Sequence, residues 1–370
     1  MEIAELNSLQ STVLWAAFAV SLAFGFIAQR THFCTMGAIS DIVNMGSWVR
    51  MRMWGMAVGV AMLGFHVMAW LGWIDPSKTI YASGRIIWLS ALTGGALFGF
   101  GMVLASGCGS KTLVRIGGGS LKSLVVFFVM GFAAFATMRG FVAVARVNTV
   151  DQVAFDMAGG SSIPVALSAL LGADPQIVSL AMALVLGLGL LVWSLLSAEF
   201  RTFDNLLAGL GIGLVIVAMW WVSGRLGFVA EHPETLEAVY LSTNSGRMEA
   251  LTFTAPMAYT LDWLIYFSDA SKVLTLGVVS VFGVIGGAWI QSVMDRSFRW
   301  EGFRGTQDTA LHLVGAVCMG VGGVTAMGCT VGQGLSGLST LGLTSVIAVA
   351  GIVAGALGGF RFQLWLLERE

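Results

Sequence analysis

Long apolar segments recur along the chain at intervals that suit a protein embedded in a membrane. A helix needs ~20 apolar residues to cross the hydrocarbon core of a bilayer. Nine segments approach or reach that length, at residues 11–28, 53–74, 87–104, 121–144, 177–197, 205–222, 272–293, 309–326 and 344–366. They lack the ~10-residue alternating pattern of a transmembrane β-barrel. The pattern therefore predicts an all-α integral membrane protein with about nine transmembrane helices, forming a single transmembrane domain.

Five shorter apolar stretches lie between these segments, and each is too brief to span. They fall at residues 35–48, 108–115, 162–172, 254–267 and 330–341. Short membrane segments are typical of re-entrant helices, whose open backbone ends are tolerated where protein or a water-filled cavity shields them. The re-entrant interpretation is favoured for 108–115 and 330–341. For the other three stretches, an interfacial or loop helix stays an equal alternative.

Composition and charge strengthen the membrane assignment and suggest an orientation. The chain is 57% hydrophobic and 11% charged, whereas soluble domains carry roughly 25% charged residues. The first apolar segment lacks a convincing signal-peptide cleavage site and is predicted to be a transmembrane helix. Twelve basic residues fall on the side of the C-terminus and six on the other side. This bias predicts an N-terminus outside and a C-terminus in the cytoplasm, and the net charge of −1 argues against a nucleic-acid partner.

The sequence also repeats itself weakly. Aligning Cys108 with Cys329 places Gly107 on Gly328 and sets the preceding apolar segments over each other. A weaker match pairs residues 29–34 with residues 295–300. Two halves that share glycine-interrupted segments are typical of transporters whose site lies between the repeats. We expect two pseudo-symmetric halves at about 1–200 and 201–370.

Cys108 and Cys329 are the first candidates for solute binding. Each follows a glycine and opens a short segment with helix potential, so a solute could approach the thiol and the free N–H groups of the next turn. A thiol there is a weak, soft hydrogen-bond donor. The alternative is that each cysteine is a small buried hydrophobic residue. The glycine-rich, apolar surroundings favour free thiols over disulfides.

Further candidates surround these two thiols. Cys34 lies just beyond the first span, in a sequence where Arg30 could pair with Asp41 or could instead be an anchor at the helix end. Lys111 and Arg115 follow Cys108 on one helical face, and either anion binding or membrane anchoring explains them. Gln333 lies four residues after Cys329 and could hold a solute oxygen. Cys318 lies in the middle of a span and is interpreted as a packing residue.

A metal site is the main rival for the thiols. Zinc sites use closely spaced cysteines and histidines, and this chain has no such pair. Three distant thiols could still form a soft Cu(I) site, which stays a weaker alternative. Since no nucleotide or dinucleotide motif is present in a suitable context, no cofactor is expected.

Three sequences carry a family resemblance: RTHFCTMGAISD from Arg30, LASGCGSKTLVRIGGGSLKSL from Leu104, and AMGCTVGQGLSGLSTL from Ala326. They resemble the three cysteine motifs of the YeeE/YedE family of sulfur-compound transporters, some of which take up thiosulfate. The resemblance implies nine transmembrane helices with short re-entrant helices in two pseudo-symmetric halves. It also implies that Cys34, Cys108 and Cys329 line a constriction where thiols hydrogen-bond the anion, and Cys318 matches none of the motifs.

These observations predict an importer in the cell inner membrane for a small sulfur-containing anion, with thiosulfate as the first candidate. The expected binding residues are Cys34, Cys108, Cys329, Gln333, Lys111 and Arg30. A cytosolic sulfur-carrier protein of the TusA type is a possible partner. His32 and the sequence around Cys108 depart from the usual motifs, so a selenium compound or another sulfur species stays open. A membrane sulfurtransferase that carries a cysteine persulfide is the alternative from another class.

Overall fold

The computed structural model describes residues 3–157, 160–233, 236–269 and 271–368. Within these residues, nine helical segments are long and apolar enough to cross a membrane. Each coincides with one of the nine predicted segments, so the predicted fold class is confirmed. The long helices are α1 (Ile3–Arg30), α3 (Val49–Trp70), α4 (Trp88–Leu104), α6 (Leu121–Arg139), α9 (Pro175–Leu195), α13 (Leu276–Met294), α14 (Thr306–Thr325) and α15 (Leu343–Leu367). The remaining span, Phe203–Leu226, is continuous helix with α11 (Ile212–Trp221) at its centre.

All five shorter apolar stretches form helices. They are α2 (Thr35–Met45), α5 (Gly109–Gly117), α8 (Ile163–Leu171), α12 (Thr254–Ile265) and a π-helical segment, η5 (Gly332–Gly337). One further helix, α7 (Phe141–Asn148), was not expected, because residues 121–144 read as one span. Gly140 adopts an extended conformation and ends α6 at Arg139, which starts the chain in a new direction.

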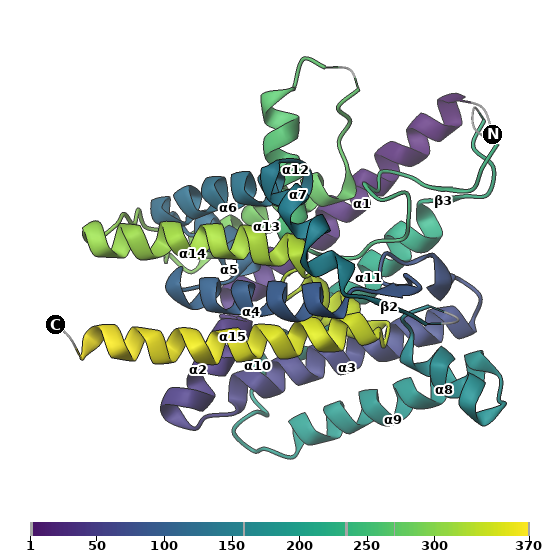
Figure 1. The fold of residues 1–370 in the computed structure, drawn as a ribbon, viewed down its shortest axis with the longest axis horizontal. Coiled ribbons are helices and arrows are strands. Elements are labelled where there is room, and N and C mark those ends of the chain that lie inside the picture. The colour runs from purple at the N-terminus through teal and green to yellow at the C-terminus, as the bar shows by residue number, and fades with distance from the viewer. Residues whose placement is uncertain (1–2, 158–159, 234–235, 270, 369–370) are drawn as a thin grey trace.

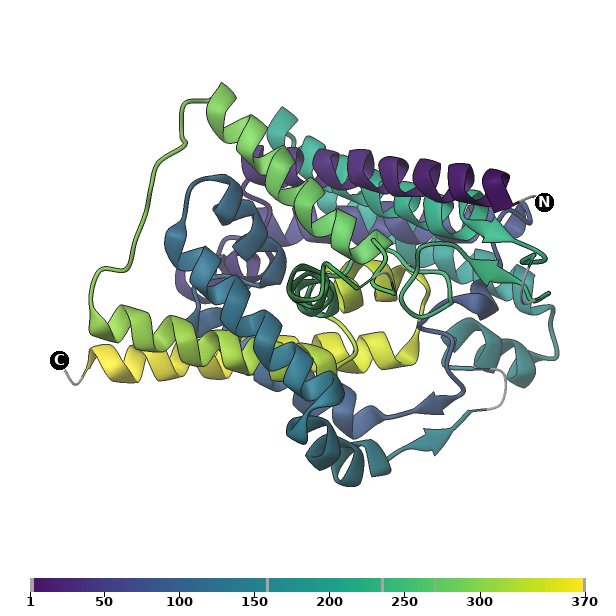
Figure 2. The same ribbon diagram turned by 90° about the horizontal axis from the view of Figure 1, so that it is seen from above.

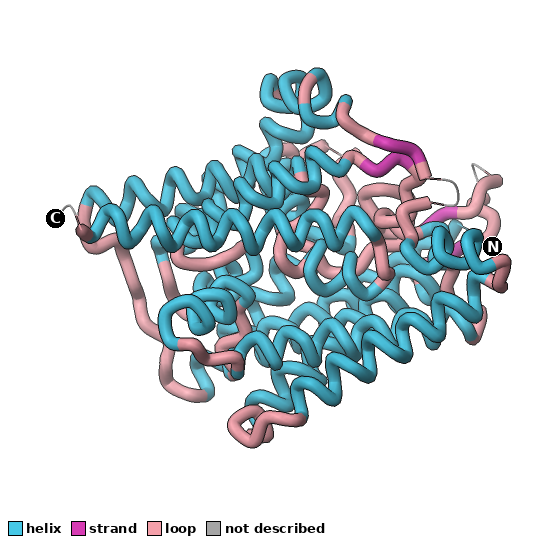
Figure 3. Tube along the Cα trace, turned by 60° about the horizontal axis from the view of Figure 1, so that its bottom comes forward, coloured by secondary structure: helices cyan, strands magenta, loops and turns pink. Residues whose placement is uncertain are grey.

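The remaining elements are short. One-turn helices are η1 (Pro76–Lys78), η2 (Val150–Gln152) and α10 (Phe203–Leu206), and π-helical turns η3 (Leu207–Gly211) and η4 (Val222–Leu226) flank α11. Strands β1 (Arg85–Ile86) and β2 (Phe155–Asp156) pair antiparallel, as do β3 (Phe228–Val229) and β4 (Val239–Tyr240). Both pairs lie toward the end of the molecule that holds the N-terminus (Figure 3).

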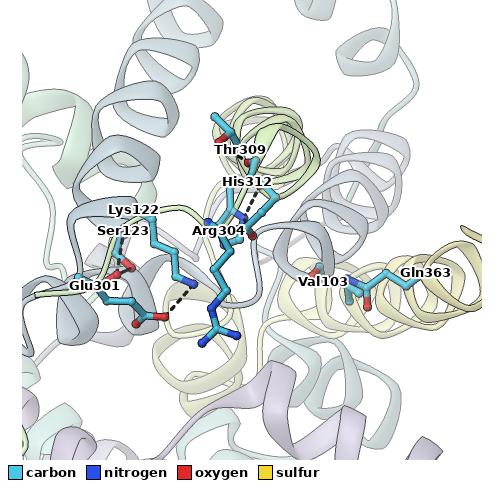
Figure 4. A network of polar contacts seen from close by, with 11 residues as sticks. Val103, Lys122, Ser123, Glu301, Arg304, Thr309, His312 and Gln363 are labelled. Atoms are coloured by element: carbon cyan, nitrogen blue, oxygen red, sulfur yellow. Dashed lines mark hydrogen bonds and ion pairs between the residues drawn. The ribbon is translucent and has the colours of Figure 1, made fainter. Parts of the chain in front are cut away.

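The N- and C-termini of the described chain lie at opposite ends of the long helices (Figure 1). This is the arrangement that an odd number of spans requires. The loop 295–305 joins α13 to α14 across the end that holds the C-terminus (Figure 2). There its Glu301 accepts a bond from Lys122 at 2.9 Å, and this pair ties the loop to the start of α6 (Figure 4).

Glycines allow the central helices to pack at very short distances. At the crossing of α4 and α14, a Cβ atom added to Gly94 would lie 2.5 Å from the Ala326 nitrogen. At the same crossing, a Cβ on Gly101 would lie 2.6 Å from the Gly315 oxygen. Close backbone approach through small residues is the usual way in which helices associate in lipid. The glycine-rich sequence thus fixes the distance between the two helices that lead to Cys108 and Cys329.

Helix contacts fall into two matching sets. Helix α4 contacts α14 and α15, while α14 also contacts α6; likewise α1 contacts α13 and α11, while α11 also contacts α3. Exchanging α1 with α11, α3 with α13, α4 with α14 and α6 with α15 leaves this contact pattern unchanged. We therefore propose that α1–α6 and α10–α15 are inverted repeats, with α7–α9 between them. The weak match of residues 29–34 with 295–300 does not fit this arrangement, because 295–300 follows α13, the counterpart of α3.

Candidate functional site

Each of three cysteines follows the same break in a helix. Two residues before the cysteine, a residue other than glycine adopts a left-handed conformation: His32 (φ 52°), Ser106 (φ 55°) and Met327 (φ 55°). At the two repeat-related breaks the hydrogen bonds also match, from Gly107 N to Met102 O and from Gly328 N to Gly323 O, both at 2.8 Å. Left-handed residues are a common way to end a helix. The sequence signal, a glycine before the cysteine, marks two of these breaks and misses the one at His32.

Each cysteine also begins the helical segment that follows. The carbonyl oxygens of Cys34, Cys108 and Cys329 accept the first helical hydrogen bonds, from the N–H groups of Ala38 (3.0 Å), Thr112 (2.9 Å) and Gln333 (2.8 Å). The position before the first helical turn has free N–H groups and the positive end of the helix dipole nearby. All three thiols therefore stand where an anion is favoured.

The three breaks meet inside the protein. The thiols of Cys34 and Cys108 lie next to each other, and the Cys108 sulfur lies 3.3 Å from the Ser110 hydroxyl. Cys108 and Cys329 are fully buried, whereas Cys34 is partly exposed. The three motifs predicted to share a site thus come together although about 220 residues separate the last two.

Two threonines complete the row of polar groups. The Thr252 hydroxyl lies 3.9 Å from the Cys329 sulfur. The Thr330 hydroxyl is buried and lies beside the Cys108 thiol. Thr330 had a weak signal in the sequence, as the neighbour of Cys329, whereas nothing in the sequence singled out Thr252.

Basic side chains gather on the side of Cys34 that faces the C-terminal end of the molecule. Lys111 is half-buried, and Cys34, Cys108, Arg115 and Arg50 are the charged or titratable groups nearest to it. The Arg50 guanidinium lies over Gly37 in the first turn of α2. Lys111 thus lies near the thiols of Cys34 and Cys108, and the Arg115 guanidinium approaches Gly107 at the helix break.

The expected pair of Arg30 and Asp41 is wrong. Arg30 is exposed, binds Asp204 at 3.1 Å and stacks on the Phe203 ring. Asp41 instead binds Arg50 at 3.3 Å. The physical reason is the direction of the chain: α1 ends with Arg30 pointing toward α10, whereas α3 begins beside α2 and brings Arg50 to Asp41.

Gln333 and Cys318 make contacts within the protein. The Gln333 amide is fully buried, donates to the Ala326 oxygen at 2.7 Å and accepts from the Ser345 hydroxyl at 2.6 Å. These bonds hold the break before Cys329 in place. Cys318 packs against Gly101 where α14 crosses α4, which agrees with a packing role.

A cavity of about 210 Å³ lies on the other side of Cys329. Thr252 and Gly328 form part of its wall, together with Glu249 and Tyr259. Nearby, the Tyr81 hydroxyl donates to the Gly332 oxygen at 2.6 Å, and burial raises the pKa of this phenol, so it stays a neutral donor. Nothing in the sequence singled out Glu249, which looked like one of several loop acids.

The sulfur and nitrogen ligands of the described residues do not form a metal centre. Across residues 3–157, 160–233, 236–269 and 271–368, no group of three or more His, Cys, Asp or Glu side chains could hold a metal ion. All four cysteines are free thiols. The thiols and hydroxyls of this arrangement are weak hydrogen-bond donors.

The nine spans found in the described residues, together with interrupted helices whose ends meet at buried polar groups, define a multi-pass membrane transporter. The chain belongs to the sulphur transport family, which it matches over residues 30–357. It is 26% identical over 97% of its length to the whole of a thiosulfate transporter, TsuA of Spirochaeta thermophila. It is 28% identical to the Escherichia coli thiosulfate transporter TsuA, over 84% of this chain and 83% of that one. The family indicated by the three cysteine motifs is confirmed, and with it transport of a sulfur compound, which is not an enzymatic activity.

Proposed function

We propose that this protein imports thiosulfate across the cell inner membrane, with its N-terminus outside and its C-terminus in the cytoplasm. The observation that carries the proposal is the row of polar groups from Thr252 and Cys329 through Thr330 to Cys108 and Cys34. It connects the outer cavity to the basic residues near the C-terminal end. The names of the two relatives, both thiosulfate transporters, support this choice of substrate.

The chemistry of the row suits a dianion that must bind and then leave. Thiols and hydroxyls donate weak hydrogen bonds, and the N–H groups at each helix start add partial positive charge. None of the groups in the row carries a full positive charge. Several weak sites permit conduction, whereas one strong site would retain the ion.

Lys111 and Arg115 serve the release side in this proposal. Their charges lower the electrostatic energy of the anion after it leaves Cys108 and Cys34, without touching it at the narrowest point. Arg50, placed beside Cys34, takes the role that the sequence assigned to Arg30. Gln333 is proposed as a positioning residue, since its amide already bonds to Ala326 and Ser345.

Uptake into vesicles containing the purified protein tests this function. A hydrogen bond to a charged group contributes about 1.5–3 kcal/mol, so Cys108→Ala should slow uptake of ³⁵S-thiosulfate by about 10- to 150-fold. Cys318→Ala is the matched control and should change uptake by less than about twofold, because that thiol only packs. Normal uptake by the Cys108→Ala and Cys329→Ala variants would contradict the proposal. Competition by sulfite and selenite measures selectivity among related anions.

The proposal extends to a cytosolic sulfur-carrier protein of the TusA type that receives the anion at the inner end. Exposed arginines of the loop 295–305 line that end. Co-purification of such a carrier with the wild type, and its loss when Arg296 and Arg299 are both changed to Ala, is the expected result. Equal recovery with both proteins would refute this contact.

A further inference from the structure

The outer cavity, which is the cavity of about 210 Å³ beside Thr252, has a buried carboxyl group in its wall. A negative charge there would oppose the binding of an anion. Glu249 is only 9% exposed and lines the cavity of about 210 Å³ together with Thr252. That volume holds roughly seven waters at the liquid density, which is ample for a small anion. Thr252 touches Cys329, so an anion one step from the first thiol stands beside this carboxyl group.

The hydrogen bonds of Glu249 orient it without neutralising it. Its Oε1 accepts from the Ser245 hydroxyl at 2.5 Å and from the Ser245 N–H at 3.0 Å. In the described part of the chain, no lysine, arginine or histidine forms an ion pair with Glu249. Burial raises the pKa of this carboxyl above its usual range, and the bonds from Ser245 only partly oppose that rise.

The groups that face Glu249 from neighbouring elements are polar but uncharged. Ser223 of η4 donates to its backbone oxygen, and the phenols of Tyr81 and Tyr259 lie near it from the loop before β1 and from α12. A second cavity of about 180 Å³ shares Asn244 and Tyr259 with the first and has charged groups in its wall. There Arg139 lies beside Lys272 and Asp262, which bind each other at 2.6 Å.

In this arrangement, the protonation state of Glu249 directly changes the electrostatic energy of an anion in the cavity. Ionised, the carboxylate repels a dianion in the same small cavity, and little water is present to screen the repulsion. Protonated, it is a neutral group whose O–H can donate to a thiosulfate oxygen. The anion in turn favours the protonated form, because two like charges at one site raise the pKa of the carboxyl group.

We propose that Glu249 takes up one proton from the outside before or with the anion, and that thiosulfate binds the outer cavity only against the neutral carboxylic acid. The inference rests on the proposed function, because it concerns the same path. Arg139 and Lys272 attract the anion to the outer cavity, and the proton on Glu249 admits it to Cys329. Uptake is then a proton-dependent process at its first step.

The pH dependence of uptake tests this inference. Thiosulfate stays a dianion between external pH 5 and 8, so any change in rate across that range comes from the protein. With one required proton, the wild-type rate should fall by about tenfold per pH unit above the pKa of Glu249. Glu249→Gln is neutral and of the same shape, and its rate should vary by less than about twofold over the range. Glu231→Gln, which changes an exposed acid of the same long loop, should keep the wild-type profile.

Two results would overturn the inference: a Glu249→Gln variant with the wild-type pH profile, or a wild type whose uptake does not depend on external pH. If Glu249→Gln fails to fold, the pH profile of the Ser245→Ala variant tests the inference instead. Loss of the hydroxyl that stabilises the carboxylate should raise the pKa of Glu249 and move the uptake profile to higher pH, and an unmoved profile refutes the proposal. If the wild type takes up thiosulfate and Cys108→Ala abolishes it while the profile is flat, the proposed function stands and only this inference fails.

Discussion

A single methyl group at the crossing of α4 and α14 should disturb both stability and transport. In Gly94→Ala, the new Cβ would lie 2.5 Å from the Ala326 nitrogen and 2.8 Å from the Gly322 oxygen. Ordinary contacts of a Cβ begin at 3.4 Å, so the two helices must separate by about 0.9 Å. Both neighbours are backbone atoms, which cannot rotate away as a side chain can.

The size of the effect follows from this geometry. Overpacking of a tight interface lowers the free energy of unfolding by about 1–3 kcal/mol, which corresponds to a fall in Tm of about 2–6 °C. Ala326 lies three residues before Cys329, so the shift also moves that thiol relative to Cys108. Misplacement of a reacting or binding group by ~1 Å can reduce a rate by ~100-fold, and we expect uptake to fall at least about tenfold.

Thermal unfolding followed by tryptophan fluorescence, together with vesicle uptake, measures both effects. Gly358→Ala is the matched control, because Gly358 lies in α15 with open space around its position for a Cβ. Alanine favours a helix over glycine by about 1 kcal/mol, so this variant should keep or raise the Tm and transport normally. The reasoning is refuted if Gly94→Ala has the Tm and the uptake of Gly358→Ala.

Two further predictions concern the helix breaks and the loop 295–305. Ser106→Gly should raise the free energy of unfolding by up to about 1 kcal/mol, because glycine removes the Cβ that makes a left-handed residue unfavourable. Ser106→Ala keeps the Cβ and should give no rise in Tm. An equal rise in both variants would contradict the explanation. Lys122→Met should speed trypsin cleavage within the loop 295–305, since the bond between Lys122 and Glu301 anchors it. That bond lowers the pKa of Glu301, so its stabilisation is present above the ordinary pKa of a glutamate and is lost as the pH falls through the lowered value. The Tm difference between wild type and Lys122→Met should therefore shrink toward acidic pH, and a difference that grows instead would refute the assignment.

The hydrophobic pattern was sufficient to predict the spans and the five short helices between them, but not α7 or the four short strands. All nine spans and all five short helices lie where the apolar segments were found, because a run of apolar residues in lipid has few structures other than a helix that satisfy its backbone. The cysteine motifs also identified the family. The boundary at Gly140 was missed, since one glycine in an apolar run does not reveal whether the chain continues straight or turns.

The sequence by itself thus determined the helices, the membrane class, the family and the three cysteines. Only the tertiary structure decided which polar groups meet: that Asp41 binds Arg50 and leaves Arg30 to Asp204, that Gln333 bonds within the protein, and that Glu249 lines the cavity beside Thr252. The physical reason is the range of the forces involved. The apolar residues that make a segment helical and membrane-spanning are neighbours in the sequence. The partners of charged and polar side chains, in contrast, depend on how helices distant in sequence cross.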